Sequence, residues 1–175
     1  MIRSTELARS SFTVRQAVVA DIPLLAHHRA AMFRDMGKLV SDQQPVLERE
    51  TAAYLAAALP RGDYLAWVAQ DAAAAIIGGA GAQLRPLLPR PRADSDNLEL
   101  GPEAIVLNVY VEPNWRRRGV AEALMRALLS ALDARGIRRV VLHASKEGRR
   151  LYQRLGFEPT NEMLLSRSDA EMRRE

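Results

Sequence analysis

The first patterned segments of the chain predict a strand and then a helix. Apolar and polar residues alternate over residues 12–18, as they do in a strand that buries one face. Residues 20–37 instead carry apolar side chains at helical spacing. Asp21 is a favoured N-cap residue for this helix, and Gly37 is a favoured residue just beyond a helix end. The folded part of the chain is therefore expected to begin with a strand followed by a helix.

The remaining elements follow from the same kind of pattern. Residues 103–111 are a nearly continuous apolar run with β-branched side chains, which is typical of a buried strand. Residues 87–102 are rich in proline and acidic turn formers and predict a loop. The expected strands are residues 12–18, 63–70, 73–86, 103–111, 137–145 and 163–167, and the expected helices are residues 20–37, 45–62, 120–136 and 148–156.

The order of these elements predicts an α/β fold with a mixed sheet. The order is β-α-α-β-β-β-α-β-α-β, and the helix over 120–136 connects two buried strands, so these two strands should be parallel. The other strands follow one another as hairpins. No repeat appears in the sequence. We expect a single domain over residues 11–167, with a flexible N-terminal tail at residues 1–10 and a C-terminal tail at residues 168–175.

Composition restricts the class of protein. The chain has 175 residues, of which 48% are apolar and 26% charged, as in a globular domain. It has no cysteine, which excludes disulfides, thiolate metal sites and a cysteine nucleophile. No apolar run suits a signal peptide or reaches the roughly 18 residues of a membrane span. We therefore expect a cytoplasmic protein with no membrane partner.

The net charge of +4 raises the question of a nucleic-acid partner. Such a protein would use the arginine clusters at 116–118, 138–139 and 149–150 as a continuous basic face with aromatic platforms. Aromatic residues are only 5% of the chain, and the clusters lie at the ends of predicted elements. We expect no nucleic-acid partner, although this class remains the competing hypothesis.

The cluster at 116–118 lies between a predicted strand and a predicted helix, and it suggests an anion site. The first amides of a helix lack backbone partners and carry partial positive charge. Gly119 has no Cβ, so the backbone there can approach a phosphate. The P-loop motif is absent. Gly79 and Gly81 form one G-x-G without the rest of a dinucleotide fingerprint, so we interpret them as a bulge or close-packing feature.

Two motifs together resemble the GCN5-related N-acetyltransferase (GNAT) family. "LNVYVEPNWRRRGVAEALM" contains that family's phosphate motif [RQ]-x-x-G-x-[GA] at Arg116, Gly119 and Ala121. "VVLHASKEGRRLYQRLGFEP" contains its later signature, a tyrosine four residues before a Gly-Phe pair, at Tyr152 and Gly156. The resemblance spans residues 13 to about 165 and includes the order of the elements.

The resemblance implies acetyl-CoA as the cofactor. It implies that the central parallel strands splay through a bulge, that freed backbone groups near Val109 to Val111 pair with the pantetheine arm, and that the amides of residues 116–121 hold the pyrophosphate. Ser145 stands where relatives have an asparagine. The implied cofactor-binding residues are Val109, Tyr110, Val111, Arg116, Arg117, Arg118, Gly119, Val120, Ala121, Ser145 and Arg149.

The chemistry implied by the resemblance is acetyl transfer to an amine. The backbone amide of Val109 or Val111 would polarise the carbonyl. Tyr152 is the candidate general acid, because a tyrosine keeps its proton at pH 7. The base stays open between side chains near the strands and a chain of waters. The side chains considered for the base are Glu103, Asn108 and His143, whereas His27 and His28 are expected to be packing or solvated residues.

The acceptor pocket is expected to be built from the first helix and its loop, Tyr110 and the turn at residues 161–163. The candidate substrate-binding residues are Phe33, Met36, Tyr110 and Glu162, with Met32, Asp35, Asn161 and Met163 beside them. An acidic group at Asp35 or Glu162 could attract an amine, but the favoured interpretation is a helix end for Asp35 and a solvated turn for Glu162. The acceptor would be a small-molecule or peptide amine, and family members often form homodimers. The alternative function is an acyl-CoA-binding sensor or regulatory protein without turnover.

Overall fold

The computed structural model of the chain describes residues 11–92 and 96–165. A boundary between two compact units falls after His143, and each unit is described by itself below. The expected tails at residues 1–10 and 168–175 lie outside the described residues. The domain bounds of 11–167 accordingly stay a prediction.

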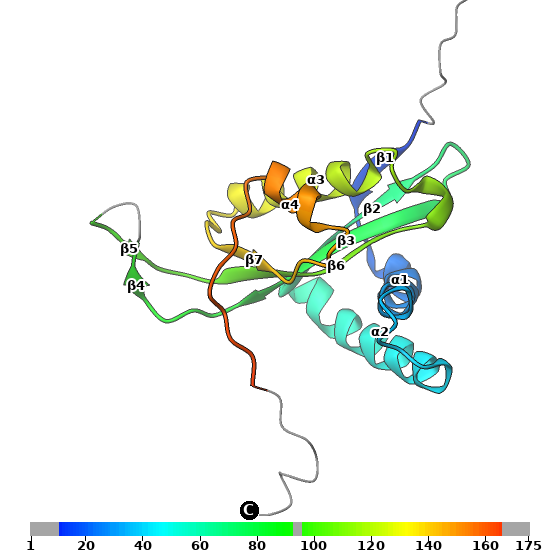
Figure 1. Cartoon of the computed structure of the whole chain (residues 1–175), viewed down its shortest axis with the longest axis horizontal. Coiled ribbons are helices and arrows are strands. Elements are labelled where there is room, and N and C mark those ends of the chain that lie inside the picture. The colour runs from blue at the N-terminus through cyan, green and yellow to red at the C-terminus, as the bar shows by residue number, and fades with distance from the viewer. Residues whose placement is uncertain (1–10, 93–95, 166–175) are drawn as a thin grey trace, which may run out of the picture. The chain divides into compact units, whose positions relative to one another are not determined.

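The first unit holds most of the secondary structure (Figure 1). Its strands are β1 (Thr13–Gln16), β2 (Tyr64–Gln70), β3 (Ile76–Arg85), β4 (Arg90–Pro91), β5 (Leu98–Glu99), β6 (Glu103–Val111) and β7 (Val140–Leu142). Its helices are α1 (Ile22–Asp35), α2 (Gln44–Arg61) and α3 (Val120–Ala134), with 3-10 turns at Val19–Asp21, Ser41–Gln43 and Pro113–Trp115. The second unit contains α4 (Arg149–Arg154).

The main sheet is mixed, as the sequence predicts. It has five strands in the order β1-β2-β3-β6-β7. The first three pairings are antiparallel, and β6 pairs with β7 in parallel through the crossover helix α3. Helices α1 and α2 cover one face of this sheet and α3 covers the other (Figure 1). In the part of the chain that the structure describes, no helix is long and apolar enough to span a membrane.

Strand β6 is interrupted by a bulge. Gly81 on β3 lies opposite Asn108, but the next residue, Ala82, lies opposite Val106, so Leu107 is the extra residue. The parallel pairing with β7 covers only Ala104 to Val106 on β6. The end of β6 that follows the bulge therefore has an edge that β7 does not pair, which is the splay that the family resemblance implies.

The two glycines of the G-x-G sequence allow close packing on the face of α1 and α2. A Cβ on Gly79 would lie 3.2 Å from Leu25 of α1, and a Cβ on Gly81 would overlap the Tyr64 hydroxyl. Gly81 also lies beside the bulge. These contacts confirm the interpretation of both glycines as packing residues.

Helix α3 begins and ends where its pattern predicts. Its N-cap is Gly119, with φ 85°, and Gly136 lies just beyond its end with φ 71°. Both residues occupy the left-handed region that glycine tolerates best. The apolar residues at the expected spacing, among them Leu124, Leu128 and Leu132, are fully buried. Burial of this face on the sheet stabilises the helix more than local propensity does.

Three expected elements differ in the structure. The strand expected over 137–145 is reduced to Val140–Leu142, because its pairing with β6 stops at the splay. In the strand expected over 163–167, residues 163–165 form no regular structure and their apolar side chains are exposed, while residues 166 and 167 lie outside the described residues. The expected loop at 87–102 contains the short hairpin of β4 and β5.

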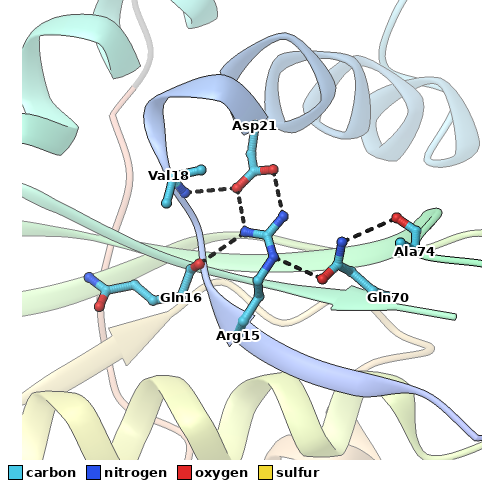
Figure 2. Close-up of polar contacts among 6 residues, drawn as sticks. All are labelled: Arg15, Gln16, Val18, Asp21, Gln70 and Ala74. Carbon is cyan, nitrogen blue, oxygen red and sulfur yellow. Dashed lines mark hydrogen bonds and ion pairs between the residues drawn. The ribbon is translucent and has the colours of Figure 1, made fainter. Parts of the chain in front are cut away.

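Asp21 occupies the N-cap position of α1, as expected, but its side chain has other partners. Its carboxylate makes no capping bond to the helix and instead accepts bonds from both terminal nitrogens of Arg15, at 2.7 and 2.9 Å, and from the Val18 amide (Figure 2). The Arg15 Nε donates to Gln70 of β2. This network joins β1, β2 and the start of α1, so Asp21 is a structural residue of the β1–α1 connection.

Candidate active site

The outer edge of β6 after the bulge presents backbone groups in a regular alternation. The Glu112 amide donates to Ile77 of β3, so alternate residues from Asn108 to Glu112 turn their backbone groups toward β3. Val109 and Val111 then turn theirs away from β3, toward the unpaired edge. The Val111 carbonyl already accepts a bond from Arg116 Nε at 3.0 Å. The Val109 amide and carbonyl are thus available to an extended ligand.

The loop that follows β6 leads directly into the start of α3. Arg117 adopts φ 64°, an uncommon left-handed conformation for a residue other than glycine, and Gly119 follows at φ 85°. No side chain caps α3, and its first backbone bond runs from the Ala123 amide to the Gly119 carbonyl. The Arg116 amide donates to the Pro113 carbonyl at 3.3 Å, so the open amides with the geometry of an anion site are those that follow Arg116 and precede Ala123. A Cβ at Gly119 would meet nothing within 4 Å, which leaves the approach open.

The Arg116 side chain has partners of its own. Its guanidinium pairs with Asp35 at the end of α1 at 2.5 Å and lies 5.6 Å from the centre of the Tyr110 ring. The expected role of Asp35 in attracting an amine therefore loses support, because its charge is already compensated by Arg116. Arg116 connects α1 to the phosphate loop, and its expected direct contact with a phosphate stays a prediction.

The side chains that follow Arg116 in the loop differ in burial. Arg117 is exposed, and the Arg118 guanidinium lies 5.2 Å from the centre of the Trp115 ring. Val120 is buried and Ala121 is half-buried.

The second unit contains the remaining residues expected at the cofactor and the acid. Tyr152 of α4 is half-buried and packs edge-on against Phe157, with ring centres 6.0 Å apart. A Cβ at Gly148 would lie 2.8 Å from the Tyr152 ring. The Gly148 amide donates to the Ser145 hydroxyl at 3.1 Å, so Ser145 stabilises the turn before α4. Arg149 is exposed at the first position of that helix.

Burial raises the pKa of the Tyr152 hydroxyl above its ordinary value. A tyrosine with a raised pKa holds its proton throughout the neutral range, as a general acid must before it reacts. Glu162, a candidate acceptor contact, is exposed in the same unit.

A pocket of about 280 Å³ lies in the first unit beside the bulge of β6. Its lining residues are Arg29, Glu50, Thr51, Tyr54, Leu55, Tyr64, Gln83, Leu107 and Asn108. Helices α1 and α2 supply one side and the strands β2, β3 and β6 supply the other. Of the expected acceptor residues, Phe33 lies under the Arg29 guanidinium at 5.0 Å. Phe33, Met36 and Tyr110 are all outside the lining, and Tyr110 packs against His28 at 5.0 Å.

Glu103, one of the side chains considered for the base, is paired with two arginines. Glu103 is 3% exposed and accepts bonds from both Arg85 and Arg139. Burial raises the pKa of Glu103, but the bonds from the two arginines outweigh it and leave the pKa lowered. Glu103 is therefore a structural anion that holds β6 to its neighbours, and these bonds weigh against Glu103 among the side chains considered for the base.

The structure also shows the positions of the other side chains considered for the base and of the two histidines of α1. Asn108 accepts a bond from Arg29 at 2.7 Å, and His143 is exposed beyond the end of β7. His28 is buried, and its Nε2 lies 3.4 Å from a Glu112 oxygen without a well-formed hydrogen bond. His27 is partly exposed and contacts Glu48. The expectation of packing or solvated roles for His27 and His28 is consistent with these positions.

The geometry of β6 and α3 agrees with a comparison against known families. A family model described as an acetyltransferase (GNAT) domain matches residues 62–159, which is more than half of the chain. The chain belongs to the GNAT acetyltransferase family. No curated protein matches the chain. The matched range includes the bulged strand, the phosphate loop and α4.

Solved structures agree with this assignment. A GCN5-related N-acetyltransferase from Ralstonia eutropha has 32% identity and a TM-score of 0.77, over 91% of this chain and 99% of that one. An acetyltransferase from Clostridium acetobutylicum, solved with acetyl-CoA, has 27% identity and a TM-score of 0.74, over 90% and 96%. An aminoglycoside N-acetyltransferase in complex with CoA, at 21% identity and TM-score 0.64 over 91% and 96%, shares the fold.

Several residues of this GNAT site escape analysis of the sequence alone. Arg29, Tyr54 and Tyr64 line the pocket, but none belongs to a motif. Arg29 looks like one more polar residue of an amphipathic helix, and its partner Asn108 is 79 positions away. The only sequence signal for this region is Gly81, whose missing side chain makes room for Tyr64.

Proposed function

We propose that this acetyltransferase moves an acetyl group from acetyl-CoA to a primary amine of a small-molecule or peptide acceptor by direct transfer, with Tyr152 as the general acid. The observation that carries the proposal is the unpaired edge of β6 at Val109, which leads into the open amides at the start of α3. An extended arm that ends in a pyrophosphate matches this pair of features.

The residues present fit acetyl-CoA. The Val109 backbone would pair with the pantetheine arm, and the amides from Arg117 to Ala121 would hold the pyrophosphate, since a Cβ-free approach exists at Gly119. Bound acetyl-CoA would supply the acetyl group, so that the amine nitrogen bonds to the carbonyl carbon as the carbon–sulfur bond breaks.

The protein's own groups then have distinct tasks. The Val109 amide donates to the carbonyl oxygen as negative charge develops there. Tyr152 gives its proton to the departing sulfur, and its raised pKa ensures that the proton is present beforehand. The proton that the amine loses passes to water. Glu103 takes no part in this step because both of its oxygens accept bonds from arginines, and its lowered pKa makes it a weak proton acceptor.

A matched pair of glycine variants tests cofactor binding. Gly119 and Gly136 lie at opposite ends of α3, both have positive φ, and a Cβ on either meets nothing within 4 Å. Each change to alanine should lower stability by about 1 kcal/mol. Only Gly119→Ala should also weaken acetyl-CoA binding, measured as the rise in Tm with added ligand. No Tm rise for the wild-type protein at millimolar acetyl-CoA would refute the proposal.

A second variant separates an enzyme from an acyl-CoA sensor. Tyr152→Phe should lower kcat for CoA release with a panel of amines by about 100-fold or more, with little change in acetyl-CoA affinity. An unchanged kcat would remove Tyr152 from the mechanism. Binding of acetyl-CoA without any CoA release by the wild-type protein would support the sensor instead.

A further inference from the structure

The pocket beside the bulge contains a cation without a carboxylate partner. Arg29 is half-buried, and a guanidinium has five N–H donors. Among the described residues, its one hydrogen bond is the bond to Asn108 Oδ1, and its other contact is the Phe33 ring. Most of the donors that Arg29 offers are therefore left for another acceptor.

The position of this guanidinium is well defined. Asn108 is only 7% exposed, and Tyr64, which is 3% exposed, lines the same pocket. Gly81 leaves the space that the Tyr64 hydroxyl occupies. Phe33 lies under the other side of Arg29. Arg29 therefore contacts both Asn108 and Phe33 and also lines the pocket.

The lining does not neutralise the charge of Arg29. Glu50 is its sole carboxylate, and Glu50 forms its ion pair with Arg49, at 2.9 Å, rather than with Arg29. Elsewhere in the first unit, half-buried arginines such as Arg15 and Arg139 do bind carboxylates. An arginine fork suits bidentate binding of a carboxylate or a phosphate.

We infer that this pocket takes a small amine that also carries an anionic group, a carboxylate or a phosphate, and that Arg29 binds that group. The inference rests on the proposed function, because it identifies the pocket as the acceptor site. Two lining residues, Leu107 and Asn108, directly precede Val109, where the acetyl carbonyl is proposed to bind. A volume of about 280 Å³ lies at the small end of ligand pockets and suits a compact acceptor.

Pairs of acceptors with and without the anionic group test this inference. One pair is a set of L-amino acids against their carboxamides, and the other is O-phosphoethanolamine against ethanolamine. The wild-type protein should favour the anionic member of at least one pair by about 10- to 100-fold in kcat/KM for CoA release. The first pair reports a carboxylate ligand and the second a phosphate ligand.

Variants of Arg29 connect the preference to this side chain. Arg29→Gln, which keeps a donor for Asn108, should abolish the preference, and Arg29→Lys should retain part of it because the charge remains. Arg61→Gln is the matched control, since Arg61 is exposed and pairs with Asp63 outside the lining, and it should leave the preference unchanged. A preference that survives in Arg29→Gln overturns the inference.

Binding to the CoA-loaded protein gives a readout without turnover. Titration calorimetry with the same compounds should show the anionic member of a pair binding about tenfold more tightly, and Arg29→Gln should lose this difference. Equal binding within both pairs, or no binding of any anionic amine in the panel, overturns the inference. If neutral amines are acetylated while no anionic preference appears, the proposed function holds and the inference about Arg29 fails. If acetyl-CoA itself does not bind, the proposed function fails.

Discussion

Arg15 and Arg29 are both half-buried, yet their surroundings differ completely. Arg15 makes two bonds to the Asp21 carboxylate, one to the Gln16 carbonyl and one to Gln70 (Figure 2). Arg29 makes one bond to a neutral amide and faces a pocket. The first arginine is satisfied by the fold, whereas the second keeps donors for a ligand. The difference teaches that the partners of a cation, more than its burial, separate a scaffold residue from a binding residue.

The largest expected effect is loss of the Arg15 network. Arg15→Gln would leave the Asp21 carboxylate, whose side chain is 7% exposed, without its cation. Breaking a buried pair costs roughly 3–5 kcal/mol, and the 37% exposure of Arg15 places the expected loss near ~3 kcal/mol. Urea unfolding would measure the change. A loss below about 1 kcal/mol would show that water replaces Arg15 readily. Arg15 would then not be a scaffold residue, and the contrast with Arg29 would fail.

The same network predicts a change in acid stability. The hydrogen bond from Arg15 lowers the pKa of Asp21, despite an opposing effect of burial. A carboxylate with a lowered pKa contributes stability above its unfolded pKa, and that stability disappears as the pH falls through the folded value. Arg15→Gln should therefore unfold with a shallower dependence on pH below about pH 4.

The contrast between the two arginines also shows what the sequence can predict. Local sequence features correctly predict α3, because Gly119 and Gly136 lie at its ends and the apolar spacing identifies its buried face. The parallel pair of β6 and β7 followed from element order. Asp21 was assigned as a helix cap because its local position suits one, but Arg15 and Val18 compete successfully for its carboxylate. Local rules fail where a tertiary partner offers a stronger bond.

The candidate site divides in the same way. The phosphate loop is a contiguous motif, so its backbone geometry was accessible from Arg116 to Ala121. The pocket residue Arg29 depends on contacts with Asn108 and Phe33 that only the folded chain brings together. Glu103 was considered as a base from its place on a central strand, and only its pairing with two arginines weighs against that role.

The next largest expected effect is the contribution of buried His28 to the pH dependence of the unfolding free energy. Burial, with a smaller contribution from His27, lowers the pKa of His28 from 6.5 to about 4. Between these values the unfolded chain binds a proton that the folded chain does not, so stability rises with pH and is lost as the pH falls below 6.5. The loss between pH 7 and pH 5 should be about 2 kcal/mol.

The matched variants for this histidine are His28→Leu and His27→Leu. His28→Leu should flatten the dependence of unfolding free energy on pH between pH 7 and pH 5, because the titrating ring is gone. His27→Leu should leave most of that dependence, since the His27 side chain is 43% exposed. A slope that persists in His28→Leu would assign the titration to another group. The test of His28, like that of Arg15, measures its effect on the stability of the fold and not on ligand binding.

The smallest expected effect is on the stability of Arg29→Gln, and it is the most informative. Arg29 has no carboxylate to leave unpaired, and glutamine can still donate to Asn108, so the free energy of unfolding should change by only about 0.5 kcal/mol. The same substitution at Arg15 is the control and should cost several times more. A loss for Arg29→Gln as large as that for Arg15→Gln would make Arg29 a scaffold residue. If Arg29→Gln instead folds normally and loses only its preference for anionic amines, the open donors of Arg29 serve a ligand and the comparison holds.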